Sequence, residues 1–107
     1  MTGLDSLIQE LRRGVIVLGI LSQLDEARYG YALMKRMADK GLEIDQGTLY
    51  PLLRRLESRG FLESEWQVEG SPRRYYQLSQ EGKAILPVLK EEWTSIVTVM
   101  DDLLADI

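Results

Sequence analysis

The sequence predicts a mainly α-helical fold with one small β-hairpin. Three observations support this: apolar residues recur at helical spacing along most of the chain, one later segment alternates as strands do, and glycines punctuate the segments. A chain of 107 residues provides material for one compact domain. Because so small a domain has a limited core, we expect it to bury apolar helices against a second copy of itself.

The first half of the chain has the pattern of three helices. Apolar residues three and four positions apart predict helices over 4–24, 29–40 and about 45–59. Gly41 suits the left-handed end of the second helix, and Asp45 is a good N-cap for the third. The short link between them is typical of a helix-turn-helix.

The third of these helices has a clear inward side and an outward side of small and basic residues. Pro51 leaves two possibilities open: the helix starts near Thr48, or it loses one internal hydrogen bond. The residues expected to face the core are Leu49, Leu52, Leu53 and Leu56.

A two-stranded hairpin follows Gly60. Phe61–Gln67 and Arg73–Leu78 have strand patterns, and Val68–Pro72 separates them as a turn. We expect Trp66 in the core of this hairpin. Since successive strand residues face opposite sides, we expect Tyr76 in the core and Tyr75 toward the outside. Three helices followed by such a hairpin predict a winged helix-turn-helix over residues 1–78.

Residues 79–107 predict one further helix, which begins at the N-cap Ser79 and carries a heptad seam suited to dimerisation. Pro87 lies inside it and is expected to kink it. The first helix has a stripe of its own that would pack against the partner. The residues assigned to the dimer interface are Leu4, Leu11, Leu86, Ile96, Met100 and Leu103.

Composition excludes several classes of function. The chain has no Cys and no His, which removes disulfides, the usual zinc sites and His- or Cys-based catalysis. No metal, no cofactor and no enzymatic activity are therefore expected. No apolar run is long enough to span a membrane and the start has no signal-peptide pattern, so the sequence predicts a cytoplasmic protein.

Charge is distributed unevenly. The net charge is −4, but residues 28–78 carry +2, whereas residues 1–27 carry −2 and residues 79–107 carry −4. Nucleic-acid binding needs only a local basic face. The middle of the chain is therefore the candidate for DNA contact, and the acidic ends are expected to face away from it.

Three stretches resemble the PadR family of transcriptional regulators: YGYALMKRM, GTLYPLLRRLESRGFLESEW and GSPRRYYQLSQEGK. The resemblance covers about residues 11–94, and the single helix at the C-terminal end is similar to that of the short subtype. It implies a regulator that binds double-stranded DNA as a homodimer. We interpret the chain as a repressor whose operator is an inverted repeat, following the symmetry of a dimer.

The expected DNA contacts lie on the third helix and the hairpin. A helix-turn-helix points the start of its second helix at base edges, and Gln46 and Arg54 have side chains able to pair with bases in a bidentate way. Arg73 and Arg74 suit phosphates or the minor groove, although charges on an exposed strand edge can also be merely solvated. The full set assigned to DNA is Lys35, Gln46, Gly47, Thr48, Tyr50, Arg54, Arg73, Arg74 and Tyr75.

Trp93 lies on the heptad seam and has two interpretations. It can pack as an ordinary interface residue. Alternatively, resemblance to multidrug-sensing short PadR proteins implies that two Trp93 rings line a pocket for flat aromatic effectors. The hypotheses that follow are a ligand-responsive repressor and a DNA-binding regulator without a small-molecule effector. The residues assigned to the pocket are Ile8, Val15, Leu89, Trp93 and Val97.

Overall fold

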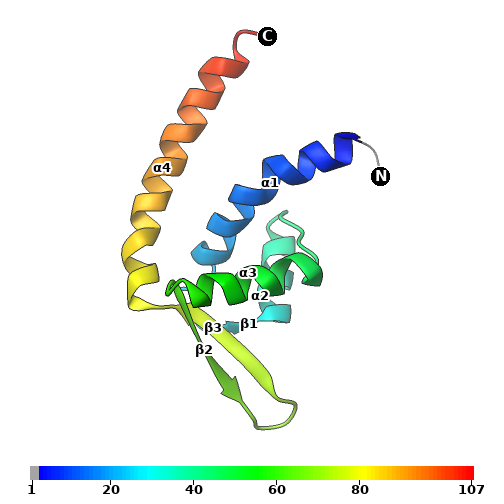
Figure 1. Ribbon diagram of the computed structural model, residues 1–107, viewed down its shortest axis with the longest axis vertical. Coiled ribbons are helices and arrows are strands. Elements are labelled where there is room, and N and C mark those ends of the chain that lie inside the picture. The colour runs from blue at the N-terminus through cyan, green and yellow to red at the C-terminus, as the bar shows by residue number, and fades with distance from the viewer. Residues whose placement is uncertain (1–2) are drawn as a thin grey trace.

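The computed structural model describes residues 3–107 and contains four helices around a small antiparallel sheet (Figure 1). No helix in this part of the chain combines the length and the apolar character that crossing a membrane requires. The elements are α1 (Gly3–Ser22), β1 (Arg28–Tyr29), α2 (Gly30–Asp39), α3 (Gln46–Ser58), β2 (Leu62–Gln67), β3 (Arg73–Leu78) and α4 (Gln80–Leu104).

The core lies where α1, α2, α3 and the base of the hairpin meet. All four leucines expected on the inner side of α3 are buried, which confirms that interpretation. Tyr76 is also buried, as expected, and this burial raises the pKa of its phenol. The core residues are Ile20, Leu21, Leu24, Leu33, Met37, Leu49, Leu52, Leu53, Leu56, Leu62, Tyr76 and Leu78.

The helix ends follow their local chemistry. The Asp45 side chain accepts a hydrogen bond from the Thr48 amide at 3.1 Å, and the Ser79 hydroxyl accepts one from the Gly82 amide at 3.0 Å. Gly41 follows α2 with φ of 99°, a conformation that glycine adopts without strain. The predicted caps of α2, α3 and α4 are therefore confirmed.

Both internal prolines are accommodated within helices. Because α3 begins at Gln46 and includes Pro51, the second possibility holds: the helix lacks the hydrogen bond that this residue's amide would make. Pro87 lies inside α4, which continues without a break to Leu104.

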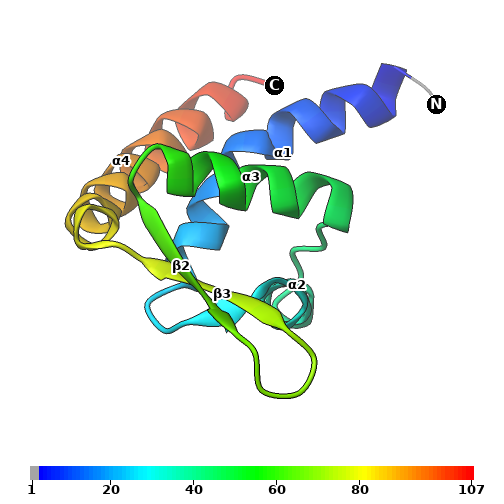
Figure 2. The same cartoon turned by 60° about the horizontal axis from the view of Figure 1, so that its bottom comes forward.

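The sheet has three strands, in the order β1-β3-β2, where the sequence predicted two. Arg28 pairs with Tyr76 and Tyr29 with Tyr75, which adds β1 to the edge of the hairpin. A strand of two residues is too short to show alternation, so its pattern could not be recognised in the sequence. The hairpin β2–β3 projects away from the helices, and its turn extends beyond both α2 and α3 (Figure 2).

This projection makes the expectation for Trp66 wrong. Its ring is 59% exposed, although Leu62 on the same side of β2 is buried. Leu62 lies at the base of the hairpin against the helices, whereas Trp66 lies four residues farther out, where the hairpin has left the core. Leu62 and Trp66 still face the same side of the sheet, but no helix covers that side at the position of Trp66.

Candidate nucleic-acid interface

The first turns of α3 present an open surface. Gln46, Gly47 and Thr48 are exposed, and a side chain at Gly47 would meet nothing closer than the Asp45 carboxylate at 3.6 Å. The hydrogen bond from Thr48 holds the pKa of Asp45 below its usual value, so the cap stays charged at neutral pH. The residues expected to approach base edges are thus exposed at the start of α3.

Tyr50 anchors α3 to the start of α2. A β-carbon built at Gly30 would lie only 2.5 Å from the Tyr50 ring, so the ring presses directly on this glycine. Tyr50 is half-buried, while Arg54 one turn later is exposed. The close approach of α2 and α3 at this point therefore depends on an aromatic ring packed against a residue that has no side chain.

The two arginines of β3 have different surroundings. Arg73 is exposed, and its guanidinium lies over the Tyr29 ring at 4.4 Å from the centroid. Arg74 donates to Glu57 Oε1 at 2.8 Å and to Ser64 Oγ at 2.9 Å, and Ser64 in turn donates to Glu57 Oε2 at 2.5 Å. Arg74 is thus committed largely to contacts within the protein, and Arg73 is the freer of the two charges.

A groove runs between α3 and the inner side of the hairpin. Trp66 pairs with Arg74 across the strands, so both side chains lie on the side of the sheet that faces α3. The groove has a volume of about 340 Å³. Side chains that line it include Tyr50, Arg54, Trp66, Arg73 and Arg74.

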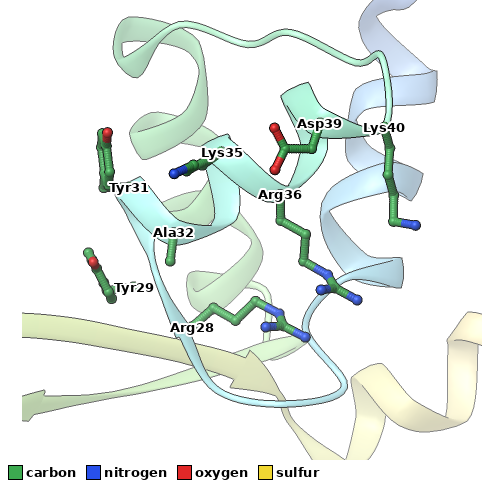
Figure 3. A pocket seen from close by; sticks show the side chains of 8 residues that line it. All are labelled: Arg28, Tyr29, Tyr31, Ala32, Lys35, Arg36, Asp39 and Lys40. Carbon is green, nitrogen blue, oxygen red and sulfur yellow. The ribbon is translucent and has the colours of Figure 1, made fainter.

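A second basic surface lies on α2 (Figure 3). Arg36 donates to Gln23 Oε1 at 2.7 Å and Arg28 donates to the Gln23 carbonyl at 2.9 Å, so both guanidinium groups are held by the loop after α1. Lys35 points the other way, toward Tyr31, and has no hydrogen-bond or ion-pair partner within residues 3–107. Lys35 is therefore the cation of α2 most available to phosphate.

Tyr75 lies on the outer side of the sheet, away from α3. Its ring packs edge-on against Tyr29, with 5.4 Å between the centroids. Any contact of Tyr75 with DNA would have to be made from this outer side of the hairpin.

The residues assigned to dimerisation and to the effector pocket fall into two groups. Leu86 and Leu89 are half-buried against the chain's own core, and Val15 is half-buried as well, so these three are partly used within the protomer. The others are exposed: Leu4, Ile8, Leu11, Trp93, Ile96, Val97, Met100 and Leu103.

Comparison with known proteins decides the family. Residues 17–87 match the model of the transcriptional regulator PadR-like family. The chain belongs to this family. The elements expected to contact DNA, namely α2, α3 and the β2–β3 wing, all lie within the matched segment. The protein is accordingly a DNA-binding transcriptional regulator and not an enzyme.

Individual relatives agree with this assignment. The chain is 37% identical over 81 residues to Transcriptional regulator Rv3488 of Mycobacterium tuberculosis, which covers 74% of this chain and 76% of that one. A PadR family transcriptional regulator from Eggerthella lenta is similar in structure, with 48% identity, a TM-score of 0.83 and coverage of 94% and 88%. A PadR family transcription regulator from Clostridium difficile is also similar in structure, with 35% identity, a TM-score of 0.76, and coverage of 83% of this chain and 97% of that one.

Two features of this PadR-like regulator differ from what the sequence pattern indicates. The pattern places α3 and β3 but does not link Glu57 to Arg74. It predicts Trp66 in the core, whereas the structure has it in the groove beside Arg54. One signal could have shown this arrangement. Ser64 and Trp66 are two residues apart on β2 and so face the same side of the sheet, and the antiparallel register pairs Trp66 with Arg74, which places Ser64, Trp66 and Arg74 together on the side that faces α3.

Proposed function

We propose that this PadR-like regulator is a homodimeric repressor that binds an inverted-repeat operator and leaves it when a planar aromatic effector enters the dimer. The observation that supports a dimer is that the second half of α4 is exposed. From Lys90 to the end of the helix every residue is exposed, yet its apolar stripe is continuous. The stripe residues Trp93, Ile96, Val97, Met100 and Leu103 are 37% to 56% exposed.

A second copy of the chain is the occupant that fits this stripe. Single amphipathic helices are marginal in water and gain most of their stability from packing their apolar side. Leu4, Ile8 and Leu11 on α1 form another uncovered stripe, and α1 and α4 diverge from the body as the two arms of a V (Figure 1). In a two-fold interface the same surfaces serve both subunits, so one symmetric contact would cover both stripes.

The proposed dimer is compatible with DNA binding on its opposite side. The wing points away from the ends of α1 and α4 (Figure 1), so association through these helices leaves α3 and the wing of each subunit free. Two recognition helices related by a two-fold axis read an inverted repeat with half-sites about one helical turn apart. A dimer bound across such a site would exclude polymerase, which is the basis for proposing repression. Since the partner is DNA, the proposed site of action is the cytoplasm.

The effector is proposed from Trp93 and from one contact in the fold. Two indoles across a two-fold interface would bound a flat apolar space that planar aromatic molecules fill by offset stacking. Arg12 on α1 donates to the Glu43 carbonyl at 2.8 Å, next to the N-cap of α3. A ligand that separates the α1 and α4 helices of the dimer would thus be coupled to the position of α3, and it would favour a state with misspaced recognition helices.

Light scattering of a charged double variant tests the dimer. Met100→Asp/Leu103→Asp places two carboxylates on the stripe and should give a monomer or an unfolded chain. Thr94→Asp/Thr98→Asp adds the same charges to exposed positions on the opposite side of α4 and should remain dimeric. A dimer of unchanged mass in the first variant would show that this stripe is not the interface.

Titration with planar dyes tests the effector. Quenching of Trp fluorescence should appear in the native chain and should be lost in Trp93→Ala, where Trp66 remains as an internal reference. Binding that survives removal of Trp93 would contradict the stacking role. Absence of binding by any dye would favour the second hypothesis, a regulator without a small-molecule effector.

A further inference from the structure

Trp66 is a large aromatic side chain that the fold leaves uncovered. It is 59% exposed, and its strand partner Arg74 is fixed by Glu57 and Ser64. Trp66 lies within strand β2, so its exposure does not arise from a loop. An indole exposed beside the recognition helix adds little to the core and is available for contact with another molecule.

The surroundings of Trp66 indicate the chemistry of that molecule. The groove between α3 and the wing is lined by Arg54, Arg73 and Arg74, and no acidic side chain lines it among residues 3–107. Tyr50 forms its opposite aromatic wall. Cations interleaved with aromatic rings suit a strand that alternates negative phosphates with apolar sugar faces.

The position of the groove selects one part of DNA. In a helix-turn-helix the second helix enters a major groove, and we place the wing, which lies beside α3, in the adjacent minor groove. The sugar-phosphate strand that separates these two grooves must then cross the space between α3 and the wing. Trp66 lies in that space, on the side of the sheet facing Arg54.

We propose that the groove between α3 and the wing binds one sugar-phosphate strand of duplex DNA, with the Trp66 ring packed on a deoxyribose, Arg54 beside one flanking phosphate, and Arg73, which reaches the edge of the groove from the Tyr75 side of β3, beside the other. This inference rests on the proposed mode of DNA binding and adds to it a contact that depends on the shape of the backbone. Trp66 therefore contributes affinity without base preference. Because indole is neutral, it displaces no counterion from DNA.

Two affinity measurements separate this role from the others. With a mixed-sequence duplex of about 30 base pairs, long enough for two half-sites, Trp66→Ala should weaken binding roughly tenfold. The loss should be similar for all sequences, and the salt dependence should keep its slope. Trp66→Phe should retain most of the affinity. Circular dichroism should show unchanged thermal stability for Trp66→Ala, because the ring is mainly exposed.

Fluorescence provides a direct readout, since the chain has two tryptophans. In Trp93→Phe, Trp66 is the single emitter, and addition of the duplex should shift its emission and protect it severalfold from acrylamide. In Trp66→Phe, where Trp93 is the single emitter on α4, the same duplex should leave acrylamide quenching unchanged.

The outcomes distinguish the Trp66 contact from the proposed DNA binding on which it rests. If the duplex binds while Trp66 emission and accessibility stay the same and Trp66→Ala binds as the native chain does, the strand contact is wrong and DNA binding stands. A loss confined to one sequence would assign Trp66 to base readout, and a loss that follows a fall in thermal stability would make it structural; either result overturns the proposal. A native chain that bound no duplex at low salt would overturn the proposed function together with this contact.

Discussion

Arg74 Nη2 lies 2.8 Å from Glu57 Oε1 and joins the second strand of the wing to the last turns of the recognition helix. Ser64 completes the cluster from the first strand. Because α3 and the wing approach DNA together, the angle between them sets which grooves they can reach at once. The ion pair thereby gives Arg74 a positioning role, whereas Arg73, the preceding residue of β3, has no ion-pair partner among residues 3–107 and keeps its charge available.

Substitution of the two neighbouring arginines should consequently have different effects. Arg73→Ala should lower the slope of the salt dependence of DNA binding by about one and leave stability unchanged. Arg74→Ala should change that slope less, because Glu57 already balances the charge. It should also reduce stability by about 1 kcal/mol, a value kept small because the pair is partly exposed. Thermal unfolding and binding at several salt concentrations test both variants, and equal slopes would contradict the distinction.

Arg54 is expected to read bases. Arg54→Ala should weaken binding to a selected operator by about 1–3 kcal/mol and should relax the preference at one position. Arg55→Ala is the matched control, since Arg55 is also exposed on α3 but does not line the groove. Selection of binding sites from a random library, performed with both variants, provides the comparison. Unchanged operator preference in Arg54→Ala would remove this residue from base readout.

The sequence predicts the helical part of the fold well because its signals are local. Helical periodicity, an N-cap at Asp45 and glycines at the helix ends act within a few residues, and all of them determine the observed boundaries. The β1 strand depends on a pairing with residues nearly fifty positions away, which no local pattern encodes.

The site is predictable only in part for a similar physical reason. Spacing along α3 identifies the outward side chains. It does not show that Glu57 pairs with Arg74, or that the wing extends beyond the helices so that Trp66 stays exposed. Both facts depend on where two elements meet in space. Residue type alone marks both Arg73 and Arg74 as candidates for DNA contact. Only the tertiary contacts show that Arg74 is paired with Glu57, whereas the charge of Arg73 stays available.

The cap of α3 should give the protein a defined acid sensitivity. The pKa of Asp45 is lowered in the folded chain from its ordinary 3.8, mainly by a hydrogen bond with the Thr48 side chain and, to a smaller extent, by the bond from the Thr48 amide. A lowered pKa means that its contribution to stability is full above the unfolded value and disappears as the pH falls through the folded value. Asp45→Asn keeps an acceptor for the Thr48 amide but does not titrate, so its stability should vary less with pH below about 4. Stability of the native chain and of Asp45→Asn would be measured across the acid range. Identical curves would contradict the prediction that Asp45 contributes to the pH dependence.

The contact between Gly30 and Tyr50 gives the sharpest test of how the helix-turn-helix is held. Gly30→Ala puts a methyl group 2.5 Å from the Tyr50 ring, closer than atoms can approach, so either the ring or the start of α2 must move. Overpacking of this kind is expected to cost about 1–3 kcal/mol. DNA affinity should fall as well, because Tyr50 is part of the surface presented by α3.

A double-mutant cycle separates this clash from the general effect of replacing a helical glycine by alanine. Tyr50→Ala removes the ring, so Gly30→Ala should cost little stability in that background, and the two substitutions should be strongly non-additive. Gly14→Ala is the control, since a β-carbon there would meet nothing within 4 Å. Denaturant unfolding of the four variants in the cycle gives the coupling energy. Additive losses would mean that the ring and the glycine do not constrain each other, and that the angle between α2 and α3 is set elsewhere in the core.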